Sequence, residues 1–336
     1  MEFESLPTTP TSEELLDKAF SKAARTGKAK YGVQAQRSML QTSSNILSDN
    51  LDNIVQTWPD FDSIHPFYYE LADILVEVDI LRKCLGKIQW ASTKTKDICR
   101  EYQSSLKGTN LEQSRIIRKQ AFARMASVVR GISNELTVLS EARHSLKNLP
   151  TINPNLPTIV VAGYPNVGKS SFVNVTTNAR NEIASYPFTT RGVLVGHIEY
   201  NYLRYQLIDT PGLLDRPMSD RNDIEKQAIT ALRHVADCIL FFIDASETCG
   251  YSLPNQLSLR DEIKLQFNIP LNTVCSKSDL STNIESDHYL YVPSDVLPSP
   301  SPSTIITPEI LSPSQLIKKA ISLIPPSDFW KNPPPR

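Results

Sequence analysis

The stretch Gly163-Tyr-Pro-Asn-Val-Gly168-Lys169-Ser170 decides the fold of this chain. It has the pattern G-x-x-x-x-G-K-S, a loop whose backbone N–H groups surround a chain of phosphates. The apolar run Val160-Val161-Ala162 precedes the loop, and the apolar pair Phe172-Val173 follows it. The motif requires a strand before it and a helix after it, and this context favours it over an ordinary glycine-containing turn.

A second motif, Asp209-Thr210-Pro211-Gly212, follows another apolar run. Its carboxylate can serve the magnesium side of a bound nucleotide, and its glycine can approach the terminal phosphate. We therefore expect Asp209 to be a metal ligand and Gly212 to act in catalysis. The two motifs together predict a P-loop nucleotide hydrolase.

The phosphate loop assigns a role to each of its polar groups. We expect the Lys169 ammonium to reach the β- and γ-phosphates and the Ser170 hydroxyl to bind Mg²⁺. Backbone donors at a helix N-terminus would come from Asn166, Val167, Gly168, Lys169, Ser170 and Ser171. Asn166 could also help to hold K⁺ beside the phosphates, and the alternative is that it stabilises the turn.

Between the two motifs lies Tyr186-Pro-Phe-Thr189-Thr190-Arg191, at the place where such enzymes carry a mobile loop. Thr190, preferred over Thr189, is expected to ligate Mg²⁺ through its hydroxyl and to sense the γ-phosphate through its N–H. The alternative is a pair of solvent-facing loop threonines.

The segment Ser276-Lys277-Ser278-Asp279 directly follows the predicted strand Asn272–Cys275. The Asp279 carboxylate can accept hydrogen bonds from N1–H and N2–H₂ of guanine, which adenine does not offer, so GTP is favoured over ATP. No Gln follows Gly212. Leu213 and Leu214 stand there instead and cannot orient water, so intrinsic hydrolysis is expected to be slow or to need help.

Residues 1–150 read as helices of an antiparallel bundle. Thr11 and Glu14 form a predicted capping box, and Pro66 suits the first position of a helix whose apolar residues continue to Ile88. Further helices are expected over Leu111–Ile132 and Ser133–Lys147.

Beyond Pro150, Pro154 and Pro157, strands and helices alternate, which predicts a doubly wound, mostly parallel α/β domain over 157–325. The expected strands are Thr158–Ala162, Val193–Tyr200, Leu203–Ile208, Cys238–Ile243 and Leu271–Cys275, and the expected helices are Asn222–Val235, Asn255–Phe267 and Pro313–Leu323. The pattern degenerates after residue 280, and 326–336 is expected to be a Pro-rich tail.

Composition limits the class of protein. The chain is 40% hydrophobic and 21% charged with a net charge of −1, which are ordinary values for a globular protein. Its five cysteines form no C-x-x-C pair, so free thiols are expected. The N-terminus lacks a signal peptide pattern, and the longest strongly apolar run, Ile239–Ile243, is too short to cross a bilayer. A cytoplasmic, monomeric protein without a membrane partner is expected.

The segment Arg82–Lys147 is basic, with 14 Lys and Arg against 5 Asp and Glu. Four of these cations project from about one third of a helix circumference: Arg115, Arg118, Lys119 and Arg130. This stripe could contact an RNA backbone. The alternative is an ordinary solvated helix face.

The chain resembles the nucleolar GTP-binding protein (NOG) family, which is related to the Obg-type GTPases. The marks of this resemblance are Gly163–Ser171, Tyr186–Thr190, Ile208–Pro217, Asp223–Ala228, Ser246–Ser252, Pro66–Leu71 and Leu149–Ile152. The resemblance implies binding of GTP and GDP and GTP hydrolysis, coupled to assembly of the large ribosomal subunit, with the subunit precursor and its ribosomal RNA as partners.

Three departures set this chain apart from the family. Ser276 replaces the Asn of N-K-x-D, whose amide usually braces the phosphate loop; Thr304–Thr307 stands where the family has S-A; and the long C-terminal extension of nucleolar members is missing. The chain thus resembles a short, archaeal-type member. Two alternatives follow, namely a non-hydrolysing scaffold on ribosomal RNA and an Obg-type translational or stress GTPase.

Overall fold

The computed structural model describes residues 3, 5–149, 151–177, 181–184, 186, 192–278, 280, 289–291 and 310–324, with backbone alone for 181–184 and 289–291. The chain divides into two compact units. One contains residues 1–64 and 75–147, and the other contains 65–74 and 148–336. None of the described helices carries an apolar stretch long enough to cross a lipid bilayer.

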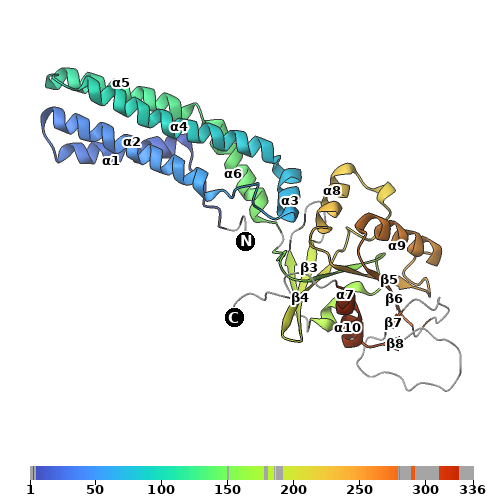
Figure 1. Cartoon of the computed structure of the whole chain (residues 1–336). Coiled ribbons are helices and arrows are strands. Elements are labelled where there is room, and N and C mark those ends of the chain that lie inside the picture. The colour runs from blue at the N-terminus through green and yellow to red at the C-terminus, as the bar shows by residue number, and fades with distance from the viewer. Residues whose placement is uncertain are drawn as a thin grey trace, which may run out of the picture. The chain divides into compact units, whose positions relative to one another are not determined.

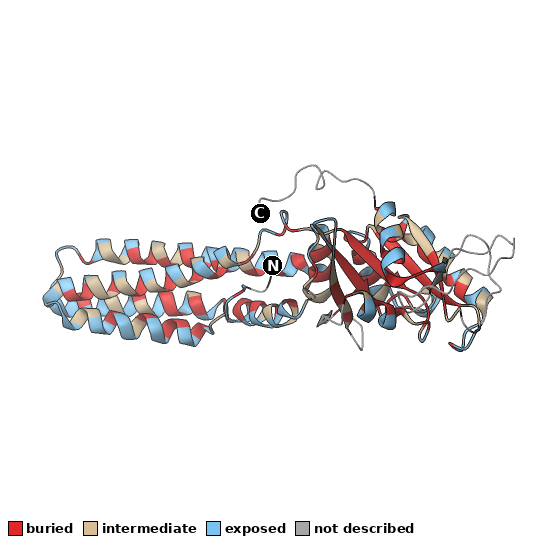
Figure 2. Cartoon of the chain, turned by 90° about the horizontal axis from the view of Figure 1, so that it is seen from below, coloured by how far each residue is buried: buried red, intermediate tan, exposed pale blue. Residues whose placement is uncertain are grey.

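The first unit is a bundle of long antiparallel helices (Figure 1). Its helices are α1 (Ser12–Lys28), α2 (Gly32–Thr57), α4 (Val78–Ser105), α5 (Leu111–Arg130) and α6 (Ser133–Lys147). The predicted capping box opens α1, because the Thr11 hydroxyl accepts from the Glu14 N–H and the Glu14 carboxylate accepts from the Thr11 N–H. Each helix buries one apolar stripe in the bundle core (Figure 2).

The helix that was expected to run from Pro66 to Ile88 is two helices. Helix α3 spans Pro66–Val76, and α4 begins at Val78. Between them Glu77 has φ 50° and ψ 91°, which no helix tolerates. The break reflects different packing partners on its two sides, since residues 65–74 belong to the second unit. There the Tyr68 hydroxyl donates to the Ile152 carbonyl at 2.5 Å.

The second unit is an α/β fold around one sheet in the order β2-β3-β4-β1-β5-β6-β7-β8. Its strands are β1 (Thr158–Ala162), β2 (Asn181–Ala184), β3 (Val193–Tyr200), β4 (Leu203–Asp209), β5 (Cys238–Asp244), β6 (Leu271–Ser276), β7 (Tyr289–Tyr291) and β8 (Ile310–Leu311). The β2–β3 and β3–β4 pairs are antiparallel, and every other neighbouring pair is parallel.

Helices cover both faces of this sheet, so the predicted doubly wound α/β architecture is confirmed. Helices α7 (Lys169–Thr176) and α10 (Pro313–Leu323) lie on one face, and α8 (Asp223–Leu232) and α9 (Leu253–Phe267) lie on the other (Figure 1). The central strands are consequently buried along their whole length, and every residue of β1 and β5 is buried. The parallel strands β4, β1, β5 and β6 end at the same edge, which places the loops that follow them side by side.

Candidate functional site

The phosphate loop joins β1 to α7 and requires glycine at two points. Gly163 has φ 133°, and a Cβ atom there would overlap the Phe242 carbonyl oxygen. Gly168 has φ 94° and forms the N-cap of α7. Asn166, with φ 62°, adopts the left-handed conformation that Asn tolerates better than most residues. The loop is thus a tight turn from strand β1 to helix α7, and the N-terminus of a helix favours anions.

Lys169 is almost fully buried beneath this loop. Its ammonium donates to the Gly163 and Tyr164 carbonyl oxygens, at 2.7 Å each. Burial lowers the pKa of Lys169, and the nearby Asp209 and Asp215 carboxylates partly offset that effect. A phosphate chain entering the loop would supply the negative charge that favours the protonated form.

Ser170 and Asp209 face each other at the ends of α7 and β4. The Ser170 hydroxyl donates to Oδ2 of Asp209 at 2.6 Å. Asp209 is fully buried, and within the described part of the chain its Oδ1 atom has no hydrogen-bond partner. Burial raises the pKa of Asp209, while Ser170 and Lys169 act in the opposite direction. This half-satisfied buried carboxylate beside a hydroxyl has the oxygen donors that a divalent cation prefers.

Gly212 forms a turn after β4 with φ 83°. Its N–H donates to Oδ2 of Asp215 at 2.8 Å. Leu213 and Leu214 are buried in the core, and the Leu214 carbonyl accepts from the Gly163 N–H at 3.0 Å. The D-T-P-G turn is therefore fastened to the phosphate loop through its backbone.

Ser276, at the end of β6, contacts the backbone of the phosphate loop. Its hydroxyl lies 2.6 Å from the Val167 carbonyl oxygen and 3.1 Å from that of Ile243. The loss of the Asn amide thus leaves a contact to the same loop, made by a shorter side chain. The sequence indicated that replacement of Asn by Ser276 removes the side-chain contact to the phosphate loop. In the structure a contact remains, through the Ser276 hydroxyl.

Lys277 has φ 52° and is fixed by the loop after β5. Its ammonium lies 2.7 Å from Oδ2 of the buried Asp244 and 2.8 Å from the Thr248 hydroxyl. Burial raises the pKa of Asp244, but hydrogen bonds from Lys277, Ser246, Thr248 and the Cys249 N–H outweigh it and bring that pKa to about 2. The Asp244 carboxylate is therefore ionised at neutral pH and holds Lys277 in place.

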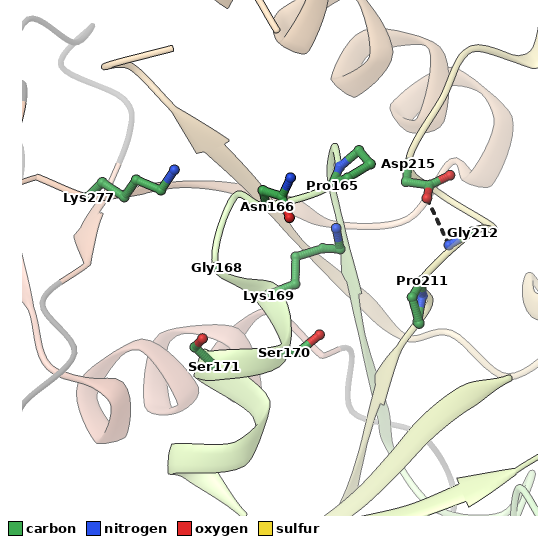
Figure 3. Close-up of a pocket in the computed structure, with 10 residues that line it drawn as sticks. All are labelled: Pro165, Asn166, Gly168, Lys169, Ser170, Ser171, Pro211, Gly212, Asp215 and Lys277. Atoms are coloured by element: carbon green, nitrogen blue, oxygen red, sulfur yellow. Dashed lines mark hydrogen bonds between the residues drawn. The ribbon is translucent and has the colours of Figure 1, made fainter. Parts of the chain in front are cut away.

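These segments surround one cavity of about 690 Å³ (Figure 3). It is lined by Pro165, Asn166, Gly168, Lys169, Ser170, Ser171, Pro211, Gly212, Asp215 and Lys277. Val167 and Asp209 are buried next to these lining residues. The predicted Thr190 and Asp279 lie outside the described residues, as does Thr304–Thr307.

Four residues that line the cavity or bond to its lining were not singled out from the sequence, namely Asp215, Arg221, Asp244 and Thr248. Asp215 is the first polar residue after the D-T-P-G turn, which is a local signal for it. Thr248 lies within the Ser246–Ser252 run, which marked the family without pointing to a contact. Asp244 and Arg221 required the tertiary structure.

The predicted RNA stripe on α5 separates into two pairs. Arg115 and Lys119 are exposed. Arg118 donates to Gln36 Oε1 at 2.7 Å and lies 5.1 Å from the Phe122 ring centroid. Arg130 pairs with Glu13 at 2.8 Å. Arg118 and Arg130 therefore have partners within the bundle.

Comparison with known proteins places both units in one family. Residues 3–153 match the family model of the NOG1 N-terminal helical domain, and residues 223–279 match that of nucleolar GTP-binding protein 1. The chain is 39% identical to nucleolar GTP-binding protein 1 of Drosophila melanogaster over 291 residues, which cover 83% of this chain and 44% of that protein. It therefore spans about half the length of that relative.

A protein from Methanocaldococcus jannaschii is matched over most of its length. It is uncharacterised and 38% identical over 291 residues, which cover 83% of this chain and 81% of that protein. A crystal structure of a nucleolar GTP-binding protein 1 candidate from Plasmodium falciparum is 44% identical, with a TM-score of 0.38, and covers 41% of this chain and 69% of that one. On the strength of the sequence identities and the two family models, the chain belongs to the nucleolar GTP-binding protein 1 family.

Proposed function

We propose that this chain binds GTP and GDP with Mg²⁺ and hydrolyses GTP slowly, as a monomeric cytoplasmic factor that binds ribosomal RNA during assembly of the large ribosomal subunit. The observation that supports this proposal most strongly is the convergence of three segments on one cavity. The phosphate loop, the D-T-P-G turn and Lys277 all line it. Relatives that carry the name nucleolar GTP-binding protein 1 support the choice of GTP.

The residues present fit a magnesium ion. Asp209 offers a buried carboxylate oxygen without a hydrogen-bond partner, and Ser170 offers its hydroxyl next to it. Asp209 and Ser170 would hold the ion, which would supply positive charge beside the phosphates of the nucleotide when bound. Thr190 is proposed as a further ligand, and Asn166, which lines the cavity, as a contact for K⁺.

Base selection is proposed to rest on Lys277 and Asp279. The ammonium of Lys277 is fixed at the cavity wall by Asp244 and Thr248. Asp279 lies two residues further on and would accept the guanine N1–H and N2–H₂. Slow turnover is proposed because Leu213 and Leu214 are buried and neither can orient an attacking water.

The charge of the bundle supports a polyanionic partner. Residues 18–48 contain no Asp or Glu, and their cations are Lys18, Lys22, Arg25, Lys28, Lys30 and Arg37. The α1–α2 and α4–α5 connections lie at the same end of the bundle (Figure 1). Tyr31, 91% exposed in the first connection, offers a ring for base stacking.

Co-sedimentation with ribosomal particles tests the proposed role. The protein would be incubated with precursor or mature large subunits, loaded with GDP or a non-hydrolysable GTP analogue. We expect it to travel with precursor particles, and to a different extent in the two nucleotide states. Preference for mature particles would favour an Obg-type translational GTPase. Binding that ignores the nucleotide, together with no GTP turnover on particles, would favour a scaffold.

A salt titration tests the RNA contacts. Affinity for RNA falls as salt rises, so log affinity against log salt has a negative slope. The double variant Arg115→Ala with Lys119→Ala should make this slope shallower by roughly 0.7–0.9 per residue removed. Arg130→Ala is the matched control, because that guanidinium already pairs with Glu13. Equal slopes for all three proteins would remove α5 from the RNA interface.

A further inference from the structure

The γ-phosphate side of the cavity contains an acidic group that the motifs do not include. Asp215 lines the cavity, and its Oδ2 atom accepts the hydrogen bond of the Gly212 N–H at 2.8 Å (Figure 3). That N–H belongs to the glycine of the D-T-P-G turn, which is expected to meet the terminal phosphate of GTP. A carboxylate of this protein therefore occupies a donor that an anionic ligand would use.

Asp215 is held in this position from two sides. The preceding Leu213 and Leu214 are 1% exposed, which fixes the backbone on the N-terminal side of the carboxylate. Arg221 lies on the other side, with its side chain 1% exposed and an N···O distance of 3.5 Å to Oδ1 of Asp215.

Arg221 is itself anchored in the same turn. Its guanidinium donates to the Gly212 carbonyl at 3.3 Å and to the Arg216 carbonyl at 3.1 Å. The contact between Asp215 and Gly212 is thus part of a connected arrangement of side chain and backbone, and Asp215 keeps a cationic partner if it leaves Gly212.

Two anions cannot share this donor without repulsion. A γ-phosphate that approaches the Gly212 N–H would meet the Asp215 carboxylate at hydrogen-bonding distance from the same atom, and like charges so close repel strongly where water is limited. A diphosphate ends one phosphate earlier and leaves the Gly212 donor unused. The penalty therefore falls on GTP alone.

We propose that Asp215 is a specificity-determining residue that favours GDP over GTP by occupying the γ-phosphate donor of Gly212. This inference deepens the proposed function and rests on it. GTP binds only when Asp215 moves away from Gly212 toward Arg221. After hydrolysis and release of phosphate, the Asp215 carboxylate returns to the Gly212 N–H. The contact between Asp215 and Gly212 is therefore made with GDP bound and broken with GTP bound.

The test compares Asp215→Asn with the unmodified full chain. Affinities for fluorescent GDP and for a fluorescent, non-hydrolysable GTP analogue would be measured in Mg²⁺. Asparagine keeps the shape of the side chain and removes its charge. We expect affinity for the GTP analogue to rise about tenfold, equivalent to about 1.4 kcal/mol, and affinity for GDP to change less than about twofold.

Asp220→Asn is the matched control, because it removes the same charge from an exposed position in the same segment. It should leave the ratio of the two affinities unchanged. Asp215→Ala provides a second variant, and thermal unfolding of both variants would verify folding. The inference would be overturned if both Asp215 variants fold and keep the unmodified ratio of GTP-analogue affinity to GDP affinity. A weaker affinity of these variants for the GTP analogue would also overturn it. Failure of the proposed function looks different, since the unmodified protein would then show no saturable binding of GDP.

Discussion

Replacement of Ser276 by alanine should weaken nucleotide binding, because the Ser276 hydroxyl is hydrogen-bonded to the backbone of the phosphate loop at Val167. This side chain is 3% exposed, and its oxygen lies 2.6 Å from the Val167 carbonyl and 3.1 Å from the Ile243 carbonyl. A hydroxyl carries one hydrogen, so it serves one of these two acceptors at a time. The substitution therefore removes one hydrogen bond and leaves a buried carbonyl without that donor.

The magnitude follows from these contacts. A neutral hydrogen bond contributes about 0.5–1.5 kcal/mol net, and a buried polar group left unpaired costs about 1–3 kcal/mol. We expect Ser276→Ala to lower the free energy of unfolding by about 1–3 kcal/mol. If about 0.5–1.4 kcal/mol of this reflects order in the phosphate loop, the affinity for GDP should fall about two- to tenfold.

Ser276→Asn provides the reciprocal change. An Asn amide has two hydrogens and could serve both carbonyls at once, so affinity for GDP should rise about two- to tenfold. Titration of fluorescent GDP and urea denaturation would measure both effects. Ser219→Ala is the control, because that hydroxyl donates to the exposed Asp220 and lies outside the phosphate loop. GDP affinity within twofold of the unmodified protein for both Ser276 variants would refute the role of this hydroxyl.

Three further predictions concern single residues of the site. Lys169→Ala should abolish nucleotide binding, because it removes the buried ammonium expected at the β- and γ-phosphates; saturable binding of fluorescent GDP by that variant would contradict this role. Asp279→Asn should relax guanine preference, and unchanged discrimination between GTP and ATP in a competition assay would refute the base-reading assignment. Asp244→Asn should lower the free energy of unfolding at pH 7 by about 2 kcal/mol, because the Asp244 pKa falls from its ordinary 3.8 to about 2 in the folded protein. Since the folded pKa is depressed, this stabilisation is complete above about pH 4 and is lost as the pH falls toward 2. Urea denaturation at pH 7 and at pH 2 should show that the difference between the two proteins shrinks in acid, and a difference independent of pH would exclude an electrostatic cause.

Apolar runs predicted the central elements well, since a strand covered on both faces leaves a simple pattern. Strand β1, strand β3, helix α6 and helix α10 have the bounds expected from the sequence. The short strands β2, β7 and β8 were not anticipated, because two to four residues carry little periodicity.

The break at Glu77 shows where periodicity fails. Apolar residues continue at helical spacing from Phe67 to Ile88, and Glu is a good helix former, so the pattern carries no stop signal. The helices separate because Phe67 and Tyr68 pack in one unit and Leu81 and Ile88 in the other. Only tertiary packing defines that boundary.

In the site too, sequence motifs predicted which segments meet but not the tertiary contacts of their side chains. Motif spacing was enough to predict that Lys169, Ser170 and Gly212 share one cavity, because loops after parallel strands meet at one sheet edge. It did not predict that Asp215 bonds to Gly212 or that Asp244 holds Lys277, because those contacts depend on loop conformations that no fixed spacing encodes.

Titration of the full chain with a fluorescent GTP analogue, in Mg²⁺ and K⁺, tests the central claim most directly. Excess ATP and then GDP would serve as competitors. The account predicts saturable binding that GDP displaces and ATP does not. Absence of binding at high micromolar protein, or displacement by ATP as effective as that by GDP, would contradict a guanine-nucleotide site in this cavity.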